Sequence, residues 1–280
     1  MEKAIKRYFP IFVLPTMIAI TLGFIIPFVE GVYLSFCKFT TVNDAKFIGF
    51  ANYAKVFADE TFVHAFWYTA AFTVVSVILI NVLAFAVALL LTKGFKGTNI
   101  FRTVFFMPNL IGGIVLGYIW QLLLNGILMK FSRTLTYSST YGFWGLIILM
   151  CWQQIGYMMI IYIAGIQNIP GELIEAAEID GATKWQILKK VTIPMVMPSI
   201  TVCTFLTLTN SFKLFDQNLA LTNGEPSKMS EMLALNIFYT FYGRTGYEGV
   251  GQAKAVIFFI LVTVIALTQN YLTRRKEVQQ

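Results

Sequence analysis

Long uncharged, apolar stretches alternate with short polar segments along this chain. Six stretches without Asp, Glu, Lys or Arg reach about 20 residues or more, the length that a helix needs to cross the hydrocarbon core of a membrane. The longest of them opens with TLTYSSTYG, which is too rich in Ser and Thr to form a helix of its own. The pattern therefore predicts six transmembrane helices at Phe9–Tyr33, Ala65–Leu91, Thr103–Leu124, Phe143–Ile166, Met195–Leu221 and Glu248–Leu272.

The composition agrees with a protein that lies mainly in lipid. Of the 280 residues, 57% are hydrophobic and 12% are charged, whereas soluble domains carry about 25% charged residues. The polar connections are too short to hold a soluble domain. We therefore predict an all-α integral membrane protein with one transmembrane domain over residues 1–280, surrounded by membrane lipid.

Basic residues are unevenly distributed between the two sides of the predicted helices. If both termini and the second and fourth connections lie on one side, that side carries 12 of the 21 Lys and Arg residues, including Arg274, Arg275 and Lys276. Because Lys and Arg favour the cytoplasmic side, both termini are expected there. The basic residues are scattered over short connections and form no stripe, so the net charge of +7 does not indicate nucleic-acid binding.

The sequence contains no pattern typical of catalysis. It lacks the phosphate-binding G-x-x-x-x-G-K-[ST], the zinc-binding H-E-x-x-H and any Cys/His cluster, and His64 is its only histidine. We expect no enzyme activity, metal site or cofactor in this chain. Two alternatives from other classes are a stand-alone secondary transporter and a membrane enzyme. A secondary transporter would need ionisable residues within the spans, and these spans have almost none. A membrane enzyme would need a set of catalytic residues, and the sequence shows none.

A polar segment of residues 167–194 separates the fourth and fifth spans. Glu172 and Glu175 lie near the start of a predicted helix, where the helix dipole favours acids. The side chains of Ala176 and Ala177 are small, so another protein can approach the helix closely there. Asp180–Gly181 should end this helix, because glycine readily takes left-handed backbone angles.

A second short amphipathic helix is expected to follow, with Trp185, Leu188 and Val191 on one face. Pro194 marks the return to the membrane. The pattern alone fits two interpretations equally well. One is a surface helix pair that covers the end of the bundle, and the other is a docking site for a soluble partner.

The same segment carries a motif of a known family. Its pattern is E-A-A, three residues, G, nine residues, I-x-L-P, and the chain reads Glu175–Ala177, Gly181 and Val191–Pro194 at that spacing. It resembles the loop of the membrane subunits of binding-protein-dependent ABC importers, which have a type I, MetI-like bundle in the bacterial cell membrane. There this cytoplasmic loop fits into a cleft of the ATPase. The resemblance implies that the ATPase contact is made by Glu172, Glu175, Ala176, Ala177, Asp180 and Gly181.

Two further stretches narrow the resemblance to carbohydrate importers. Arg102–Asn125 is similar to the third-span region of sugar permeases, and Ser211–Pro226 to the exit of their fifth span. Glu225 stands where that exit has the second glycine of T-x-G-G-P, which leaves the loop conformation open. The implied function is the permease subunit of a sugar importer. Glycerol phosphate or another small solute is the alternative substrate.

The resemblance also implies a substrate path between the fourth and fifth spans. Amide, phenol and hydroxyl groups within a span should face a cavity or a neighbouring helix, so hydrogen bonding to a partner permease is the alternative role for these side chains. The expected path residues are Gln153, Gln154, Tyr157, Thr207, Asn210 and Ser211.

Three smaller expectations concern neighbours of these spans. Lys213 and Asp216 are three residues apart and can pair on one helix. Lys254, near the start of the sixth span, can extend its ammonium group outward to the membrane surface. Gly113 and Gly117 form a G-x-x-x-G pair that favours close helix packing.

The implied assembly contains a second, similar permease, two cytoplasmic ATPase subunits and an extracytoplasmic sugar-binding protein. ATP and Mg²⁺ would be held by the ATPase, since this chain has no phosphate-binding loop. ATP-driven closure of the ATPase dimer would then switch the helix bundle between outward-open and inward-open states.

Overall fold

The computed structural model describes residues 2–94 and 96–274, and nearly all of its regular structure is helical. Arg275 and Lys276, which entered the charge analysis, lie outside the described residues. The chain forms two compact units. The first comprises Met1–Glu60 and Ile237–Ile260, and the second comprises Thr61–Asn236 and Leu261–Gln280.

The first unit opens with a long, apolar helix. It consists of α1 (Glu2–Ile20), a π-helical turn (Thr21–Ile25) and α2 (Ile26–Leu34). From Ile11 onward its side chains are largely exposed, with Phe12 at 78% exposure. This apolar surface must be covered by lipid or by another chain.

A short outer connection follows this helix. Strands β1 (Cys37–Lys38) and β2 (Lys46–Phe47) pair antiparallel, and α3 (Ala51–Phe57) comes next. Asp44 sits between the strands and accepts bonds from the backbone N–H groups of Thr40 and Thr41, each 3.0 Å long. These two bonds hold the pKa of the Asp44 carboxyl below its ordinary value.

Lys254 is fully buried in the first unit, so the expectation that it reaches outward is wrong. It lies on α14 (Glu248–Arg274) and donates to Asp59 Oδ2 at 2.7 Å and to Thr240 Oγ1 at 2.8 Å. Thr240 belongs to α13 (Leu233–Tyr242). The ammonium group stays inside because a carboxylate and a hydroxyl from other segments meet it there.

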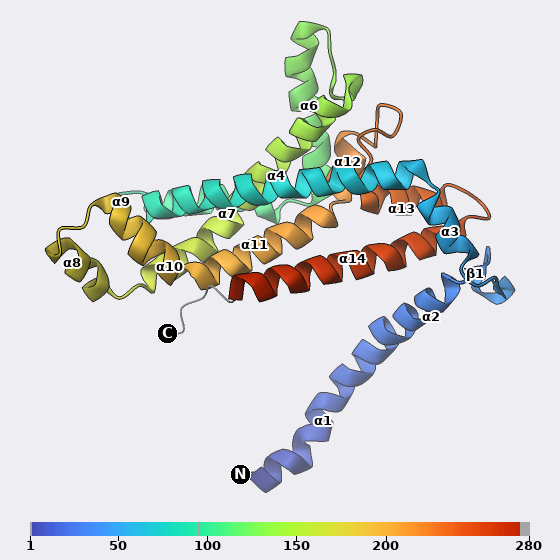
Figure 1. The fold of residues 1–280 in the computed structure, drawn as a ribbon, viewed down its shortest axis with the longest axis horizontal. Helices are drawn as coiled ribbons and strands as arrows, with labels where there is room; N and C mark the ends of the chain where they lie inside the picture. Colours follow the sequence, from blue (N-terminus) through green and yellow to red (C-terminus); the bar gives the residue numbers. More distant parts are fainter. Residues whose placement is uncertain (1, 95, 275–280) are drawn as a thin grey trace. The chain divides into compact units, whose positions relative to one another are not determined.

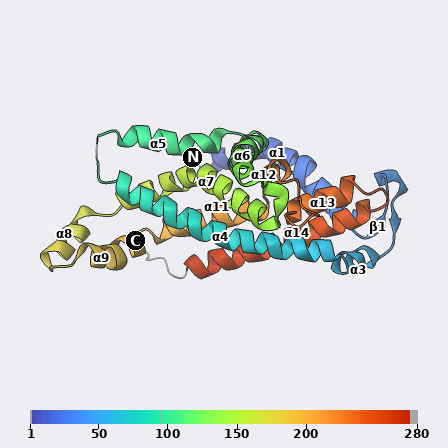
Figure 2. The same cartoon turned by 90° about the horizontal axis from the view of Figure 1, so that it is seen from above.

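The second unit is built around the helices α4 (Glu60–Leu91), α7 (Ser139–Gln167) and α11 (Met197–Phe212), which share one buried core (Figures 1 and 2). Asn81 on α4 joins them: its Oδ1 accepts from Tyr162 Oη at 2.7 Å and its Nδ2 donates to Thr207 Oγ1 at 3.3 Å. The buried core around this contact includes Phe72, Ile80, Leu149, Met158 and Cys203.

The third expected span is interrupted. Its residues divide among α5 (Thr98–Phe106), a 3₁₀ turn (Met107–Leu110) and α6 (Gly113–Leu128). Pro108 lies in the 3₁₀ turn, and Gly112 after it is extended. Proline lacks the N–H that would continue the α5 hydrogen bonds, so α6 starts as a separate helix.

The fifth expected span, Met195–Leu221, is also broken. At its start, Lys184–Met195 and Met197–Phe212 meet at an angle of 69°, and at its end α12 (Asp216–Leu221) is a separate helix. Within the described residues, five helices are long and apolar enough to cross a membrane, and the count is six if this bent pair is taken as one span.

Gly113 and Gly117 pack against α12, as their spacing predicted. A Cβ atom at Gly117 would lie 2.5 Å from Ala220 Cβ, and one at Gly113 would lie 2.8 Å from Asp216 Cβ. Both distances are far below van der Waals contact, so only glycine allows α6 and α12 to approach this closely.

We expect Gly117→Val to lower the stability of the protein by about 1–3 kcal/mol, because the added side chain overpacks the α6–α12 contact. The measurement is thermal unfolding of the detergent-purified protein. Gly126→Val is the matched control, because Gly126 lies on the same helix with no atom within 4 Å of an added Cβ. Equal unfolding midpoints for the two variants would contradict the packing role.

Candidate functional site

The helix α8 (Gly171–Ile179) ends where the sequence predicted a break. Gly181 has a φ of +75°, and its N–H donates to Glu178 O at 3.0 Å. The N–H of Ala182 donates to Ala177 O, also at 3.0 Å. This paired hydrogen-bond pattern satisfies the last carbonyls of the helix and needs a left-handed residue at Gly181.

The following helix, α9 (Lys184–Ile187), begins with a capping box that the sequence analysis overlooked. Gln186 Oε1 accepts from Thr183 N at 2.7 Å, and Thr183 Oγ1 accepts from Gln186 N at 3.4 Å. The residues T-K-W-Q carry this signal.

Of the predicted apolar face of Trp185, Leu188 and Val191, the last two side chains are half-buried. Leu188–Thr192 forms a π-helical turn, which rotates the later side chains relative to α9. Trp185 is 69% exposed, whereas Ile187 is buried.

The predicted ATPase-contact residues lie together on an accessible surface. Figures 1 and 2 show α8 and α9 at one end of the second unit, where α4 ends. Ala177 is half-buried and the other five predicted contact residues are exposed: Glu172, Glu175, Ala176, Asp180 and Gly181. Ile179, at the end of α8, is 86% exposed. A polar segment that also exposes large apolar side chains is typical of a surface that another protein covers.

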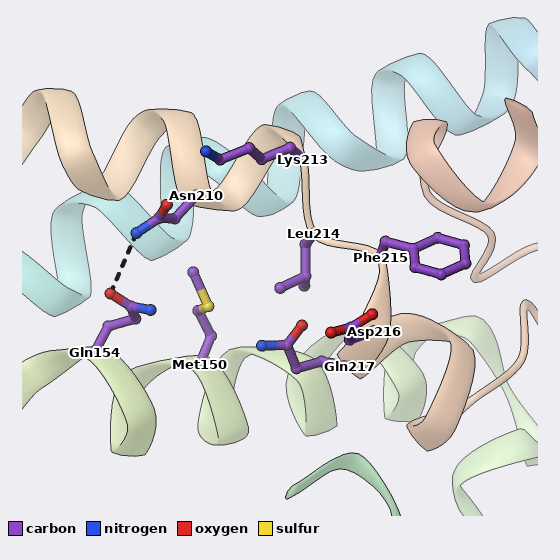
Figure 3. A pocket seen from close by; sticks show the side chains of 8 residues that line it. All are labelled: Met150, Gln154, Asn210, Lys213, Leu214, Phe215, Asp216 and Gln217. Atoms are coloured by element: carbon purple, nitrogen blue, oxygen red, sulfur yellow. Dashed lines mark hydrogen bonds between the residues drawn. The ribbon is translucent and has the colours of Figure 1, made fainter. Parts of the chain in front are cut away.

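A cavity of about 280 Å³ opens beside the second break in the fifth span, between α11 and α12 (Figure 3). α7 forms one wall, and the end of α11 with the start of α12 forms the other. Residues 213–215 interrupt the helix, so side chains of both segments turn toward the same space. The lining residues are Met150, Gln154, Asn210, Lys213, Leu214, Phe215, Asp216 and Gln217.

Four carboxamides and a backbone carbonyl join the cavity walls. Asn210 Nδ2 donates to Gln154 Oε1 at 3.4 Å, the bond drawn in Figure 3. Gln217 Nε2 donates to Gln153 Oε1 at 2.8 Å, and Gln153 Nε2 donates to Ile111 O at 3.4 Å. Of the predicted path residues, Gln154 and Asn210 therefore meet at the cavity, with Gln153 directly behind.

The other predicted path residues do not line this cavity. Tyr157 packs against Phe106 of α5, with ring centroids 6.4 Å apart. Thr207 donates to Cys203 O at 2.7 Å and accepts from Asn81. Ser211 is fully buried. Tyr157 and Thr207 therefore contact neighbouring helices, and α5 covers α7 so closely that a Cβ atom at Gly156 would clash with the Phe105 carbonyl oxygen.

Sequence reasoning missed Lys213, Asp216 and Gln217 as cavity residues. It treated Lys213 and Asp216 as an ion pair on one continuous helix. The structure corrects this, because α11 ends at Phe212 and no ion pair joins the two side chains within the described residues. The stretch K-L-F-D contains neither proline nor glycine, so no local signal marks the break.

The exit loop after α12 is anchored by a buried asparagine. Asn218 Nδ2 donates to Ser230 O at 2.8 Å, and Asn218 Oδ1 accepts from Met232 N at 2.9 Å. Glu225, which replaces the family glycine, accepts from the N–H of Ser227 at 3.0 Å. The loop therefore accommodates this glutamate through a hydrogen bond at its tip.

The chain is similar to known proteins over most of its length. Residues 80–278 match the family model of the binding-protein-dependent transport system inner membrane component. The chain is 42% identical over 278 residues to the "Probable starch degradation products transport system permease protein AmyD" of Thermoanaerobacterium thermosulfurigenes, a match that covers 96% of this chain and 94% of the relative. It is 28% identical over 288 residues to the "Multiple sugar-binding transport system permease protein MsmF" of Streptococcus mutans serotype c, covering 99% of each.

Among solved structures, the fold resembles a chain of a bacterial ABC transporter involved in the import of the acidic polysaccharide alginate. The TM-score is 0.82 at 23% identity, and the match covers 98% of both chains. The inward-facing MetNI methionine ABC transporter matches with a TM-score of 0.58 at 23% identity, covering 77% of this chain and 96% of that one. These likenesses concern the fold, and they confirm the predicted all-α bundle.

Proposed function

Because this chain belongs to the family of inner membrane components of binding-protein-dependent transport systems, we propose that it is the permease subunit of an ATP-driven carbohydrate importer. The observation that carries the proposal is the 42% identity, over almost the whole chain, to a permease named for starch degradation products. The family and its carbohydrate branch, both predicted from the sequence, are thereby confirmed.

In this proposal the α8–α9 segment docks onto a cytoplasmic ATPase, which places both termini of the chain in the cytoplasm. The exposed acids Glu172 and Glu175, the small Ala176 and the exposed Ile179 support such a contact, because they combine charge, close approach and apolar area. A second, similar permease would supply the other half of the path. Two ATPase subunits and an extracytoplasmic sugar-binding protein would complete the assembly.

The cavity beside Gln154 and Asn210 is proposed as part of the sugar path. A carboxamide both donates and accepts hydrogen bonds, which suits the hydroxyl groups of a sugar. The Asn210–Gln154 bond is 3.4 Å long, so an incoming hydroxyl can replace it at small cost. Lys213 in the same wall is the observation that favours the alternative, a phosphate-bearing solute.

The double variant Gln154→Ala, Asn210→Ala is expected to raise the sugar concentration for half-maximal uptake by about tenfold or more, because each lost hydrogen bond contributes about 0.5–1.5 kcal/mol. Uptake is measured in cells that carry the co-encoded importer genes. Thr209→Ala is the matched control, because Thr209 neighbours Asn210 but bonds to Phe205 O of its own helix. Unchanged uptake in the double variant would remove these residues from the path.

The assembly is tested by reconstituting this chain with its co-encoded partners in proteoliposomes. Uptake should require ATP and a sugar-binding protein, and a thermal-shift panel on that binding protein identifies the sugar. Uptake driven by an ion gradient without ATP would overturn the importer proposal and favour a secondary transporter.

A further inference from the structure

Two opposite charges face the cavity from either side of the helix break. Lys213 follows the last residue of α11, and Asp216 is the first residue of α12. Both line the cavity and both are exposed. In Figure 3, Lys213 extends back toward Asn210, whereas Asp216 lies beside Gln217.

The helix break keeps these charges apart. On a continuous helix, residues three apart are neighbours and would pair. Here residues 213–215 leave the helical path, and no ion pair joins Lys213 to Asp216 within the described residues. Water that enters the cavity solvates the two groups, and a bound solute that displaces it must replace those hydrogen bonds.

The chemistry of the lining defines what such a solute offers. An ammonium group only donates hydrogen bonds and a carboxylate only accepts them, so together they need a ligand that does both. Hydroxyl groups do so. A phosphate monoester or a free carboxylate would suit Lys213 but would bring a like charge close to Asp216.

The remaining wall fits the same class of ligand. Phe215 and Met150 add apolar surface, which suits the C–H face of a sugar ring, and Gln154, Asn210 and Gln217 add amides. The formal charges of the lining side chains cancel. The cavity therefore favours a neutral, hydroxyl-rich solute over an anion.

We propose that Lys213 and Asp216 are specificity-determining residues that contact hydroxyl groups of a neutral saccharide during transport. The proposal rests on the carbohydrate-importer function and extends it to two residues and to the charge of the substrate. It also disfavours glycerol phosphate, the alternative substrate.

The test pairs side-chain variants with substrate analogues. Uptake of maltotriose and of its monodeoxy derivatives is measured for the wild-type importer, for Asp216→Asn and for Lys213→Gln. We expect each variant to raise the half-maximal maltotriose concentration by about tenfold, since hydrogen bonds to charged groups are the stronger ones. For one deoxy derivative per variant, the variant and the wild type should have the same half-maximal concentration, because the hydroxyl group that the side chain contacts is missing from that derivative. For any one sugar, the binding protein makes the same contacts with the wild-type importer and with the variants. Its contribution therefore cancels when the two are compared.

The results of this test distinguish sugar contact from the absence of contact and from pairing of Lys213 with Asp216. Equal penalties at every deoxy position would show that the two side chains do not contact the sugar. Full recovery by the charge-swapped variant Lys213→Asp, Asp216→Lys would show that they pair with each other, which overturns the proposal. Binding-protein-stimulated ATPase activity verifies that each variant assembles. If the wild-type importer transports no neutral sugar from a panel, the carbohydrate function itself fails.

Discussion

Replacing Gly181 by proline is expected to abolish sugar uptake while the transmembrane helices stay folded. Gly181 has a φ of +75°, and proline is confined to a φ near −65°. The same substitution removes the N–H that donates to Glu178 O. The end of α8 must therefore rearrange, and the exposed residues of the α8–α9 segment lose the geometry with which we propose they dock onto the ATPase.

Two measurements separate lost docking from lost folding. Co-purification of the ATPase subunit should fail for Gly181→Pro, whereas the unfolding midpoint of the permease should change little, because the substitution lies in an exposed segment. Gly246→Pro is the matched control: Gly246 also has a positive φ, +84°, but lies outside this segment. We expect Glu175→Lys to give the same loss through reversed charge. Normal uptake together with retained ATPase in both α8–α9 variants would refute the docking role.

Replacing Lys254 by alanine is expected to destabilise the protein by about 3 kcal/mol, the lower end of the range for breaking a buried ion pair. Lys254 is fully buried, so its loss leaves Asp59 without its ammonium partner and opens a cavity. We choose the lower end because the Asp59 side chain is 19% exposed and keeps some access to water.

The readout is the unfolding midpoint of the detergent-purified protein. The double variant Asp59→Asn, Lys254→Met should recover part of the loss, because neither charge is then left buried alone. Lys55→Ala is the control, since Lys55 is exposed and its Nζ lies 5.8 Å from the ring centroid of Tyr247. A similar decrease for Lys55→Ala would show that the buried pair has no special role.

Some features of the candidate site follow from short-range patterns in the sequence. The end of α8 at Gly181 depends on backbone angles and on hydrogen bonds between residues five or fewer positions apart, which a motif can encode. Gln154 and Asn210 were identified from the resemblance to sugar permeases, and a carboxamide in an apolar span also needs a polar environment. Their meeting at one cavity required the packing of α7 against α11.

Other features had no local signal. The break after Phe212 falls in a stretch without proline or glycine, and it turns a presumed Lys213–Asp216 pair into two separate cavity residues. Lys254 was expected to reach the membrane surface because it lies near the start of the sixth span, whereas its partner Asp59 lies 195 positions away in the sequence.

The sequence by itself determined that this chain is a helical membrane permease with the E-A-A motif between its predicted fourth and fifth spans. Span length, charge distribution and the E-A-A spacing can each be seen in short stretches of sequence. Each determines either the backbone conformation of its own segment or whether that segment lies in lipid or in water. Only the tertiary structure decided which polar groups face a cavity, which charges are buried and where a span breaks. These outcomes depend on side chains that distant segments bring together, and their free energies arise only when those segments pack.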